Sequence, residues 1–199
     1  MEKPADIQFH VHELLSRRWS PRAFADQPVE PEKIQSLLEA ARWASSSFNE
    51  QPWVFIMATI DHSAEHQKLL SCLKEGNQIW AHKAPLLMLT IAKMHFDHNG
   101  QANRHAYHDV GLAVGNLVVQ ATAMDLAIHQ MAGILPDKIR EYYSLPAGYE
   151  AVTGIAIGYK GDFKNLPDPL RERELAPRSR KSLREFVYSV SWGHSPDFL

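Results

Sequence analysis

Hydrophobic residues recur every three to four positions in several segments, the spacing that places them on one face of a helix. The sequence predicts helices at 6–17, 31–44, 63–75 (ending at Gly76), 105–128 and 136–145. The segment 105–128 is apolar on nearly every side. We therefore expect it deep in the core or in a contact between subunits.

Three shorter segments are apolar almost without interruption, at 53–60, 86–92 and 151–161. Such runs are typical of strands buried on both faces. Strands separated by helices predict an α+β or α/β class with a covered sheet, and the pattern alone leaves the strand order open. The remainder of the chain is rich in loops. Its apolar tail (Leu183, Phe186, Val187, Tyr188, Trp192 and Phe198) must be buried somewhere, and we favour a partner subunit.

A length of 199 residues suits a single domain, 1–199, with a core that needs no disulfide. The formal net charge of -2 gives no field that would attract nucleic acid or a membrane surface. The lone cysteine, Cys72, lies in an apolar helical stretch and is read as a buried, inert thiol. The N-terminus lacks a signal-peptide pattern and no apolar run approaches about 20 residues, so we expect a cytoplasmic protein.

Several common catalytic motifs are absent. The sequence contains no G-x-G-x-x-G, no P-loop, no G-x-S-x-G and no H-E-x-x-H. Two histidine pairs, His95 with His98 and His105 with His108, have the short spacing of metal ligands. No cysteine or glutamate completes a familiar set, so we interpret them as solvated or substrate-side histidines and expect no metal.

Three polar clusters are candidates for chemistry. The segment 17–24 (RRWSPRAF) carries three arginines and a serine, and guanidinium groups match phosphate oxygens in pairs. The segment 45–53 (SSSFNEQPW) offers hydroxyls and amides, which suit a polyhydroxy chain or the edge of a heterocycle. The segment 177–181 (PRSRK) is a second basic cluster. Taken singly, the first cluster also fits a solvated basic turn, the second an ordinary capping loop and the third a solvated charge run.

Taken together and in order, these clusters resemble the nitroreductase family of flavin mononucleotide (FMN) enzymes. The specific motifs are R-x-S-x-R-x-F at 18–24 and S-S-x-N-x-Q-P-W at 46–53. Similarity continues through the later segments: 76–80, 84–85, 109–128, 131–133, 157–159 and the closing basic cluster. The resemblance covers nearly the whole chain.

The resemblance implies an α+β fold, a three-layer α/β/α sandwich with a central mixed, mainly antiparallel sheet and an extended C-terminal arm. It also implies a homodimer with two FMN sites at the interface. The implied cofactor-binding residues include Arg18, Ser20 and Arg22 of one subunit and Ser46, Ser47, Asn49 and Gln51 of the other. The remaining ones are Trp19, Asn77, Met131, Ala132, Gly133, Arg178 and Arg180.

By resemblance, Arg18, Arg178 and Arg180 hold the phosphate, and Arg22 lies at the pyrimidine edge. Asn77 meets the ribityl chain or the pyrimidine ring, and backbone at 132–133 approaches the flavin N5. The implied reaction is ping-pong: NAD(P)H delivers hydride to N5, and a nitroaromatic, quinone or similar small acceptor then takes the electrons. The flavin performs the chemistry. Arg22 supplies electrostatic support, and no side chain is assigned as catalytic.

Some positions depart from the family pattern. Ser45 replaces a proline, Trp19 a small or polar residue, and Trp80 a lysine that faces the flavin in some members. No long insertion follows Lys93 to close a lid. The alternatives are a reductive dehalogenase or a flavin-cleaving relative in the same superfamily, or a non-catalytic FMN-binding module.

Overall fold

A computed structural model describes residues 2–199 of the chain. Its helices, 3-10 turns and strands follow one another in this order: α1 (Glu13–Arg17), α2 (Pro31–Arg42), η1 (Ser47–Asn49), β1 (Trp53–Thr59), α3 (Ser63–Leu70), α4 (Glu75–Ala81), β2 (Leu86–Lys93), α5 (Ala106–Ala123), β3 (Ala127–Met131), α6 (Pro136–Tyr142), β4 (Tyr149–Gly158), η2 (Phe163–Asn165), α7 (Asp168–Leu175) and η3 (Leu183–Glu185).

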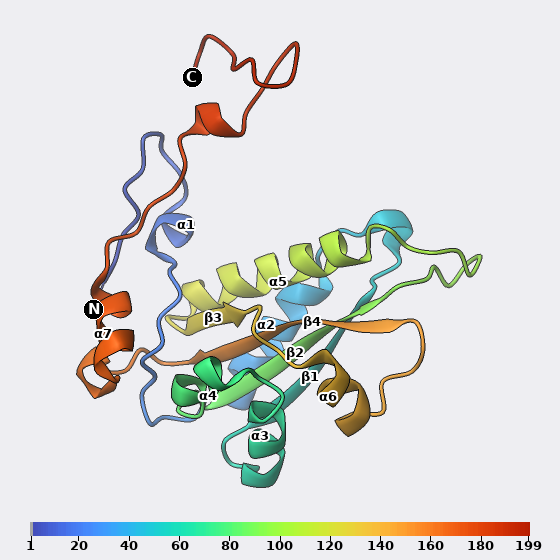
Figure 1. The fold of residues 1–199 in the computed structure, drawn as a ribbon, viewed down its shortest axis with the longest axis vertical. Coiled ribbons are helices and arrows are strands. Elements are labelled where there is room, and N and C mark those ends of the chain that lie inside the picture. The colour runs from blue at the N-terminus through green and yellow to red at the C-terminus, as the bar shows by residue number, and fades with distance from the viewer. Residues whose placement is uncertain (1) are drawn as a thin grey trace.

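One four-stranded sheet, in the order β1-β2-β4-β3, forms the centre of the fold (Figure 1). All strand pairings within residues 2–199 are antiparallel. The mainly antiparallel sheet that the resemblance implied is therefore present, here without a parallel pair. The three expected strands are confirmed with small shifts at their ends.

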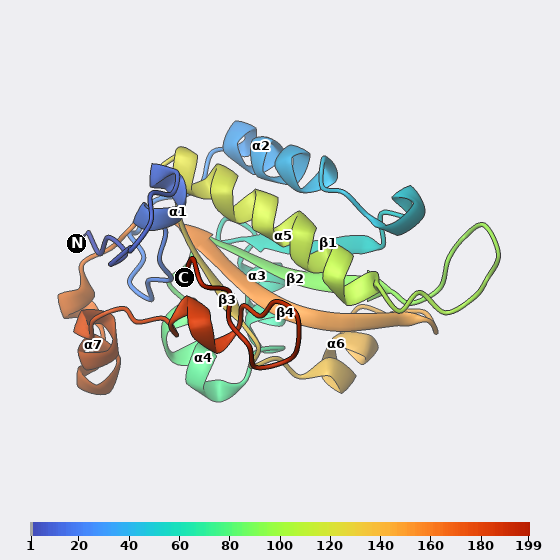
Figure 2. The same cartoon turned by 90° about the horizontal axis from the view of Figure 1, so that it is seen from above.

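Helices cover both faces of the sheet, as the unbroken apolar strands predicted. Figure 2 shows α2 and α5 on one side and α3, α4 and α6 on the other. Along β2, Leu87, Leu89 and Ile91 pack into the cluster under α3 and α4, whereas Leu86 and Met88 pack under α2 and α5. This alternation gives the α/β/α sandwich two apolar cores with β2 between them.

The predicted helices at 31–44 and 136–145 end two and three residues early, and the other three differ more in extent. The first helix covers only Glu13–Arg17, because the apolar residues 7–11 are exposed and have nothing in this chain to pack against. The helix at 63–75 ends at Leu70, and Gly76 belongs to α4 instead of ending a helix. The long helix ends at Ala123, five residues before its predicted end. Its C-terminus is closed by Asp125, whose φ of 59° reverses the chain.

Besides α4, the strand β3 and the helix α7 were not expected from the sequence. The end of the predicted long helix is the edge strand β3, which pairs with β4. The segment read as loop after residue 161 contains α7, which is strongly polar. Its one buried residue is Glu174, a feature that hydrophobic periodicity cannot reveal.

The extended C-terminal arm is confirmed. After α7 the chain leaves the body and runs beside the N-terminal segment (Figure 1), with η3 as its one regular turn among the described residues. Its side chains Phe186, Val190, Trp192 and Phe198 are exposed. These side chains do not pack on their own domain, which is expected of a segment that contacts a partner subunit.

The lone cysteine lies in the core, as predicted. Cys72 is fully buried, and burial raises the pKa of its thiol, which keeps it protonated and inert.

Among the described residues, no helix combines the length and apolar character needed to cross a bilayer. The cytoplasmic location stays a prediction.

Candidate functional site

Three arginines from the two ends of the chain come together at the root of the arm. Burial, followed by the nearby charges of Arg178 and Arg180, lowers the pKa of the Arg18 guanidinium. Burial and Arg180 likewise lower the pKa of Arg178. Within residues 2–199 no carboxylate forms an ion pair with any of the three. Such a concentration of positive charge is suited to a polyanionic ligand.

Hydrogen bonds to a neighbouring hydroxyl and to backbone carbonyls fix two of these guanidiniums. Arg18 Nη1 donates to Ser20 Oγ at 3.1 Å. Arg178 Nη1 donates to the carbonyls of Lys3 and Ser16 at 2.6 and 2.9 Å, which ties the arm to the N-terminal segment. Trp19 Nε1 is buried without a hydrogen-bond partner in the described part of the chain, so one further donor is left for a ligand.

The backbone and the guanidinium of Arg22 both lie beside a buried carboxylate that the sequence did not predict. Glu174 of α7 is 1% exposed, and its Oε1 accepts the backbone N–H groups of Arg22 and Ala23 at 2.9 and 3.4 Å. Its Oε2 lies 3.6 Å from Arg22 Nη1. Because a buried carboxylate requires a partner, Glu174 and the Arg22 guanidinium fix each other in place.

Trp80, which by resemblance stands where some family members carry a flavin-facing lysine, is buried and does not face an open site. It is 2% exposed and packs against Phe24 and His129, with ring centroids 6.3 and 4.5 Å away. His129 Nδ1 bonds to the carbonyl of Pro21 at 2.9 Å. Burial, aided by Arg22 and Arg18, lowers the pKa of His129 to about 4. The histidine that bonds to Pro21, in the segment between Arg18 and Arg22, is therefore neutral.

A second group of predicted site residues meets where α4 passes the end of β3. Asn77 Nδ2 donates to the carbonyl of Gly133 at 3.0 Å. A Cβ on Gly133 would lie 2.6 Å from that Nδ2, so only glycine allows this approach. Met131 is buried, whereas the backbone at Ala132 and Gly133 reaches the surface. The Asn77 side chain keeps its oxygen as an acceptor for a ligand.

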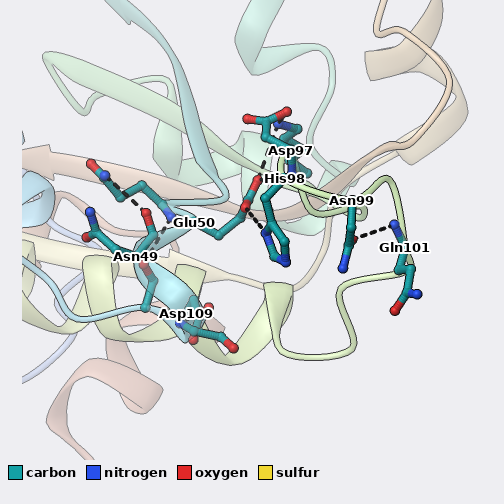
Figure 3. A network of polar contacts seen from close by, with 11 residues as sticks. Asn49, Glu50, Asp97, His98, Asn99, Gln101 and Asp109 are labelled. Atoms are coloured by element: carbon teal, nitrogen blue, oxygen red, sulfur yellow. Dashed lines mark hydrogen bonds and ion pairs between the residues drawn. The ribbon is translucent and has the colours of Figure 1, made fainter.

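The serine-rich loop is tightly shaped. Phe48, Asn49 and Gln51 all have φ between 52° and 55°, a left-handed conformation that costs energy in residues other than glycine. Ser46 Oγ accepts the N–H of Gln51 at 3.0 Å. Asp109, buried at the start of α5, accepts the N–H of Ser47 at 2.9 Å (Figure 3). The exposed amides of Asn49 and Gln51 are thus held in a fixed arrangement.

This loop and the arginine cluster lie at opposite ends of α5 (Figure 1). Asp109 anchors the loop at the N-terminal end, and the carbonyl of Thr122 accepts Arg17 Nη2 at 2.7 Å at the other end. Thirteen residues of helix separate these anchors, or about 20 Å at a rise of 1.5 Å per residue. One chain therefore does not bring together all the residues predicted to bind the cofactor.

The histidine pairs do not form a metal cluster. His98 Nδ1 lies 3.8 Å from Glu50 Oε2, and His108 Nδ1 lies 3.0 Å from Asp109 Oδ1. Among residues 2–199, no three histidine, cysteine or acidic side chains come close enough to hold a metal ion.

Comparison with known proteins adds an independent view. The model of the nitroreductase family matches residues 15–159. The crystal structure of an oxidoreductase containing FMN matches with a TM-score of 0.90 and 35% sequence identity, over 96% of each chain. Major NAD(P)H-flavin oxidoreductase of Aliivibrio fischeri is 23% identical over 218 residues, or 89% of this chain and 96% of that protein.

Another relative is iodotyrosine deiodinase 1 of Sus scrofa, 23% identical over 189 residues. The match covers 79% of this chain and 63% of that protein, so the chain spans less than two thirds of its length. The family model covers well over half of the present sequence, and the arrangement of strands and helices agrees with it. This chain belongs to the nitroreductase family.

Proposed function

We propose that this protein is an FMN-dependent NAD(P)H oxidoreductase that acts on a small acceptor such as a nitroaromatic or a quinone. The observation that carries the proposal is the convergence of Arg18, Arg178 and Arg180 without an acidic partner among the described residues. These guanidiniums repel one another, and a phosphate dianion between them would remove that repulsion. The names of similar proteins, an oxidoreductase containing FMN and an NAD(P)H-flavin oxidoreductase, agree with it.

The residues present fit FMN at each of its parts. Arg18, Arg178 and Arg180 would hold the phosphate, with Ser20 and the unpaired Trp19 Nε1 as neighbouring donors. Arg22 would face the pyrimidine edge. Its positive charge there would stabilise negative charge on the ring system, and Glu174 would fix the orientation of the guanidinium. When bound, FMN would supply the redox chemistry, accepting hydride from NAD(P)H at N5 and passing electrons to the acceptor.

The opposite face of the cofactor site would come from Asn77 and the end of β3. Asn77 Nδ2 is already engaged with the Gly133 carbonyl, so its oxygen would meet the ribityl chain or the ring. The backbone at Ala132 and Gly133, close to Met131, would approach N5. Because Gly133 lacks a side chain, Asn77 can lie against this backbone.

We further propose a homodimer in which Ser46, Ser47, Asn49 and Gln51 complete the partner's site. The support is the separation of this loop from the arginines along α5. Two antiparallel copies of α5 would bring the loop of one chain to the arginines of the other. The helix has a matching exposed face of small and apolar residues: Gly111, Leu112, Gly115 and Val119.

The first test is the visible spectrum of the purified protein, with and without added FMN. We expect a yellow protein that binds FMN, and bleaching of the flavin absorbance when NADH or NADPH is mixed in by stopped flow. Reoxidation by a quinone would complete the cycle. A protein that stays colourless after incubation with excess FMN would contradict the proposal, and bleaching without reoxidation by any acceptor would favour a binding module.

A reductive dehalogenase is the second candidate, because an iodotyrosine deiodinase is among the similar proteins. The connection between β2 and α5 is short and offers no long segment to cover a zwitterionic substrate. Release of iodide from iodotyrosine, measured beside quinone reduction with the same reduced protein, separates the two activities.

A further inference from the structure

Phe48 is the most unusual residue of the serine-rich loop. It stands between Ser47 and Asn49, two residues proposed to contact FMN, and its side chain is 81% exposed. Its φ of 53° places a bulky residue in the left-handed region, where steric cost is high. Strain of this kind persists where the surrounding structure enforces it, and it is concentrated at functional sites.

Two further rings stand beside Phe48. The Phe96 centroid lies 5.8 Å from that of Phe48 with the planes at 88°, an edge-to-face contact. The His98 ring lies 5.6 Å from Phe48 and 5.2 Å from Phe96. Phe48, Phe96 and His98 thus form one cluster, here called the aromatic wall. It joins the serine-rich loop to the hairpin between β2 and α5.

A buried carboxylate holds this wall together. The Glu50 side chain is 5% exposed, and its Oε1 accepts the N–H of Asp97 at 2.8 Å and lies 3.4 Å from Lys93 Nζ. Its Oε2 lies 3.8 Å from His98 Nδ1 (Figure 3). Glu50 follows Asn49 directly in the chain. The hairpin is therefore bound to the same loop that carries the proposed flavin contacts.

The hairpin itself is closed by its own backbone. Phe96 N–H donates to the carbonyl of Gln101 at 2.9 Å, and Gly100 N–H donates to the carbonyl of Phe96 at 2.9 Å. Gln101 N–H donates to Asn99 Oδ1 at 2.9 Å. The aromatic wall is thus pre-formed, which reduces the entropy lost when a ligand binds.

We propose that the aromatic wall is the recognition surface for the electron acceptor and that it selects small planar aromatic molecules over non-aromatic ones of the same charge. The inference rests on the proposed function, which places Ser47 and Asn49 at the flavin. A ring bound beside them would contact the exposed face or edge of Phe48. His98 Nδ1 lies 3.8 Å from Glu50 Oε2, and in the imidazolium form, in which both ring nitrogens carry protons, Nε2–H would donate to a nitro, quinone or carboxylate oxygen.

Binding of two inert ligands to the FMN-loaded protein tests this directly. Benzoate and cyclohexanecarboxylate share size and charge, and only the first has an aromatic ring. Their dissociation constants are measured by isothermal titration calorimetry for the natural protein and for Phe48→Asn, Phe96→Leu and Tyr142→Leu. Tyr142 is an exposed aromatic residue on α6, outside the wall, and serves as the control.

We expect Phe48→Asn and Phe96→Leu to weaken benzoate binding by about two- to tenfold, the range for loss of one aromatic contact, and to leave cyclohexanecarboxylate binding unchanged. Phe48→Asn should also keep or raise the thermal unfolding midpoint, because asparagine tolerates the left-handed conformation.

Two results would overturn the aromatic wall. One is equal loss of both ligands, or no loss of either, in a variant that still binds FMN. The other is conversion of the dimer to monomer by Phe48→Asn in sedimentation velocity, because the rings would then be a subunit contact. Failure of the natural protein to bind FMN would instead remove the proposed function, so the two failures are distinguishable.

Discussion

The Glu174 carboxylate lies 3.6 Å from the Arg22 guanidinium and at the same time accepts the backbone N–H of Arg22 at 2.9 Å. One acidic side chain thus fixes both the loop that carries Arg22 and the direction of its charge. The residue comes from α7, 152 positions further along the chain. Its charge also offsets part of the positive charge that Arg22 would present to a flavin.

Replacing Glu174 by glutamine separates these two effects. Glu174→Gln keeps an oxygen for the two N–H groups but removes the negative charge beside Arg22. We expect the flavin midpoint potential to rise by about 30 mV or more, which is about 1.4 kcal/mol for a two-electron couple. The unfolding free energy should fall by about 1–3 kcal/mol. Glu172→Gln, an exposed neighbour, is the control, and an unchanged potential in Glu174→Gln would refute the coupling.

Removing Arg22 should have the opposite effect on the flavin. Arg22→Ala should lower the midpoint potential or weaken FMN binding, and should destabilise the fold by about 3–5 kcal/mol because Glu174 is left buried and unpaired. The double variant Arg22→Ala with Glu174→Gln should recover much of the stability but not the potential. Urea unfolding and spectroelectrochemistry measure the two quantities. Recovery of both in the double variant would show that Arg22 acts on the fold alone.

The phosphate site has its own signature in a comparison of FMN with riboflavin, which lacks the phosphate. Arg180→Gln should weaken FMN binding by about 10- to 100-fold, as expected for loss of one charge-assisted contact, and should leave riboflavin binding unchanged. Without ligand the variant should be slightly more stable, because it relieves the repulsion that lowers the pKa of Arg18. Arg184→Gln, further along the arm, is the control. Equal losses for FMN and riboflavin would contradict a phosphate contact.

The shared site predicts that dimerisation and FMN binding are lost together. Gly115 lies on the exposed face of α5, and a Cβ there meets nothing within 4 Å, so the single chain tolerates a side chain. Gly115→Glu places like charges opposite each other across a twofold interface. We expect a folded monomer in sedimentation velocity that no longer retains FMN. Gln35→Glu adds the same charge on α2 as a control, and a monomer with full FMN affinity would disprove the shared site.

The sequence predicted those parts of the fold in which local pattern and burial agree. The strands at 53–60 and 86–92 were located because sheets covered on both faces require unbroken apolar runs. The helix at 6–17 was overpredicted because periodicity cannot say whether a partner surface exists. The strand β3 was hidden because Ala127 and Ile128 continue the apolar pattern of α5, and the break at Asp125 depends on a backbone reversal.

The candidate site was predictable where a motif is local and hidden where it depends on distant contacts. Arg18, Ser20 and Arg22 were proposed from the resemblance that their spacing carries, and Asn77 with Gly133 from the same resemblance and its order along the chain. Glu174 and His129 were not found. One lies in a polar segment and the other in an apolar strand, and each acquires its role by contacting the loop near Pro21 and Arg22. A glutamate buried on an otherwise polar helix leaves no periodic signal.

His129 makes stability depend on pH in a defined window. Burial first, and then Arg22 and Arg18, lower its pKa from about 6.5 in the unfolded chain to about 4 in the folded protein. Between these values the unfolded chain binds a proton that the folded protein does not. The unfolding free energy should therefore fall as the pH decreases from 6.5 to 4, by about 3 kcal/mol in total from this group. Above pH 6.5 the histidine is neutral in both states and does not lower the unfolding free energy.

The comparison variant is His129→Gln, whose amide can still donate to the Pro21 carbonyl but does not titrate in this range. Urea unfolding of the FMN-free protein between pH 4.5 and 7.5 isolates the histidine as the difference between the two slopes, because the carboxylates are common to both. His62→Gln, at an exposed position, should keep the slope of the natural protein. Parallel slopes for the natural protein and His129→Gln would mean that His129 binds protons equally in the folded and unfolded chains, and its folded-state pKa would then not be lowered by burial.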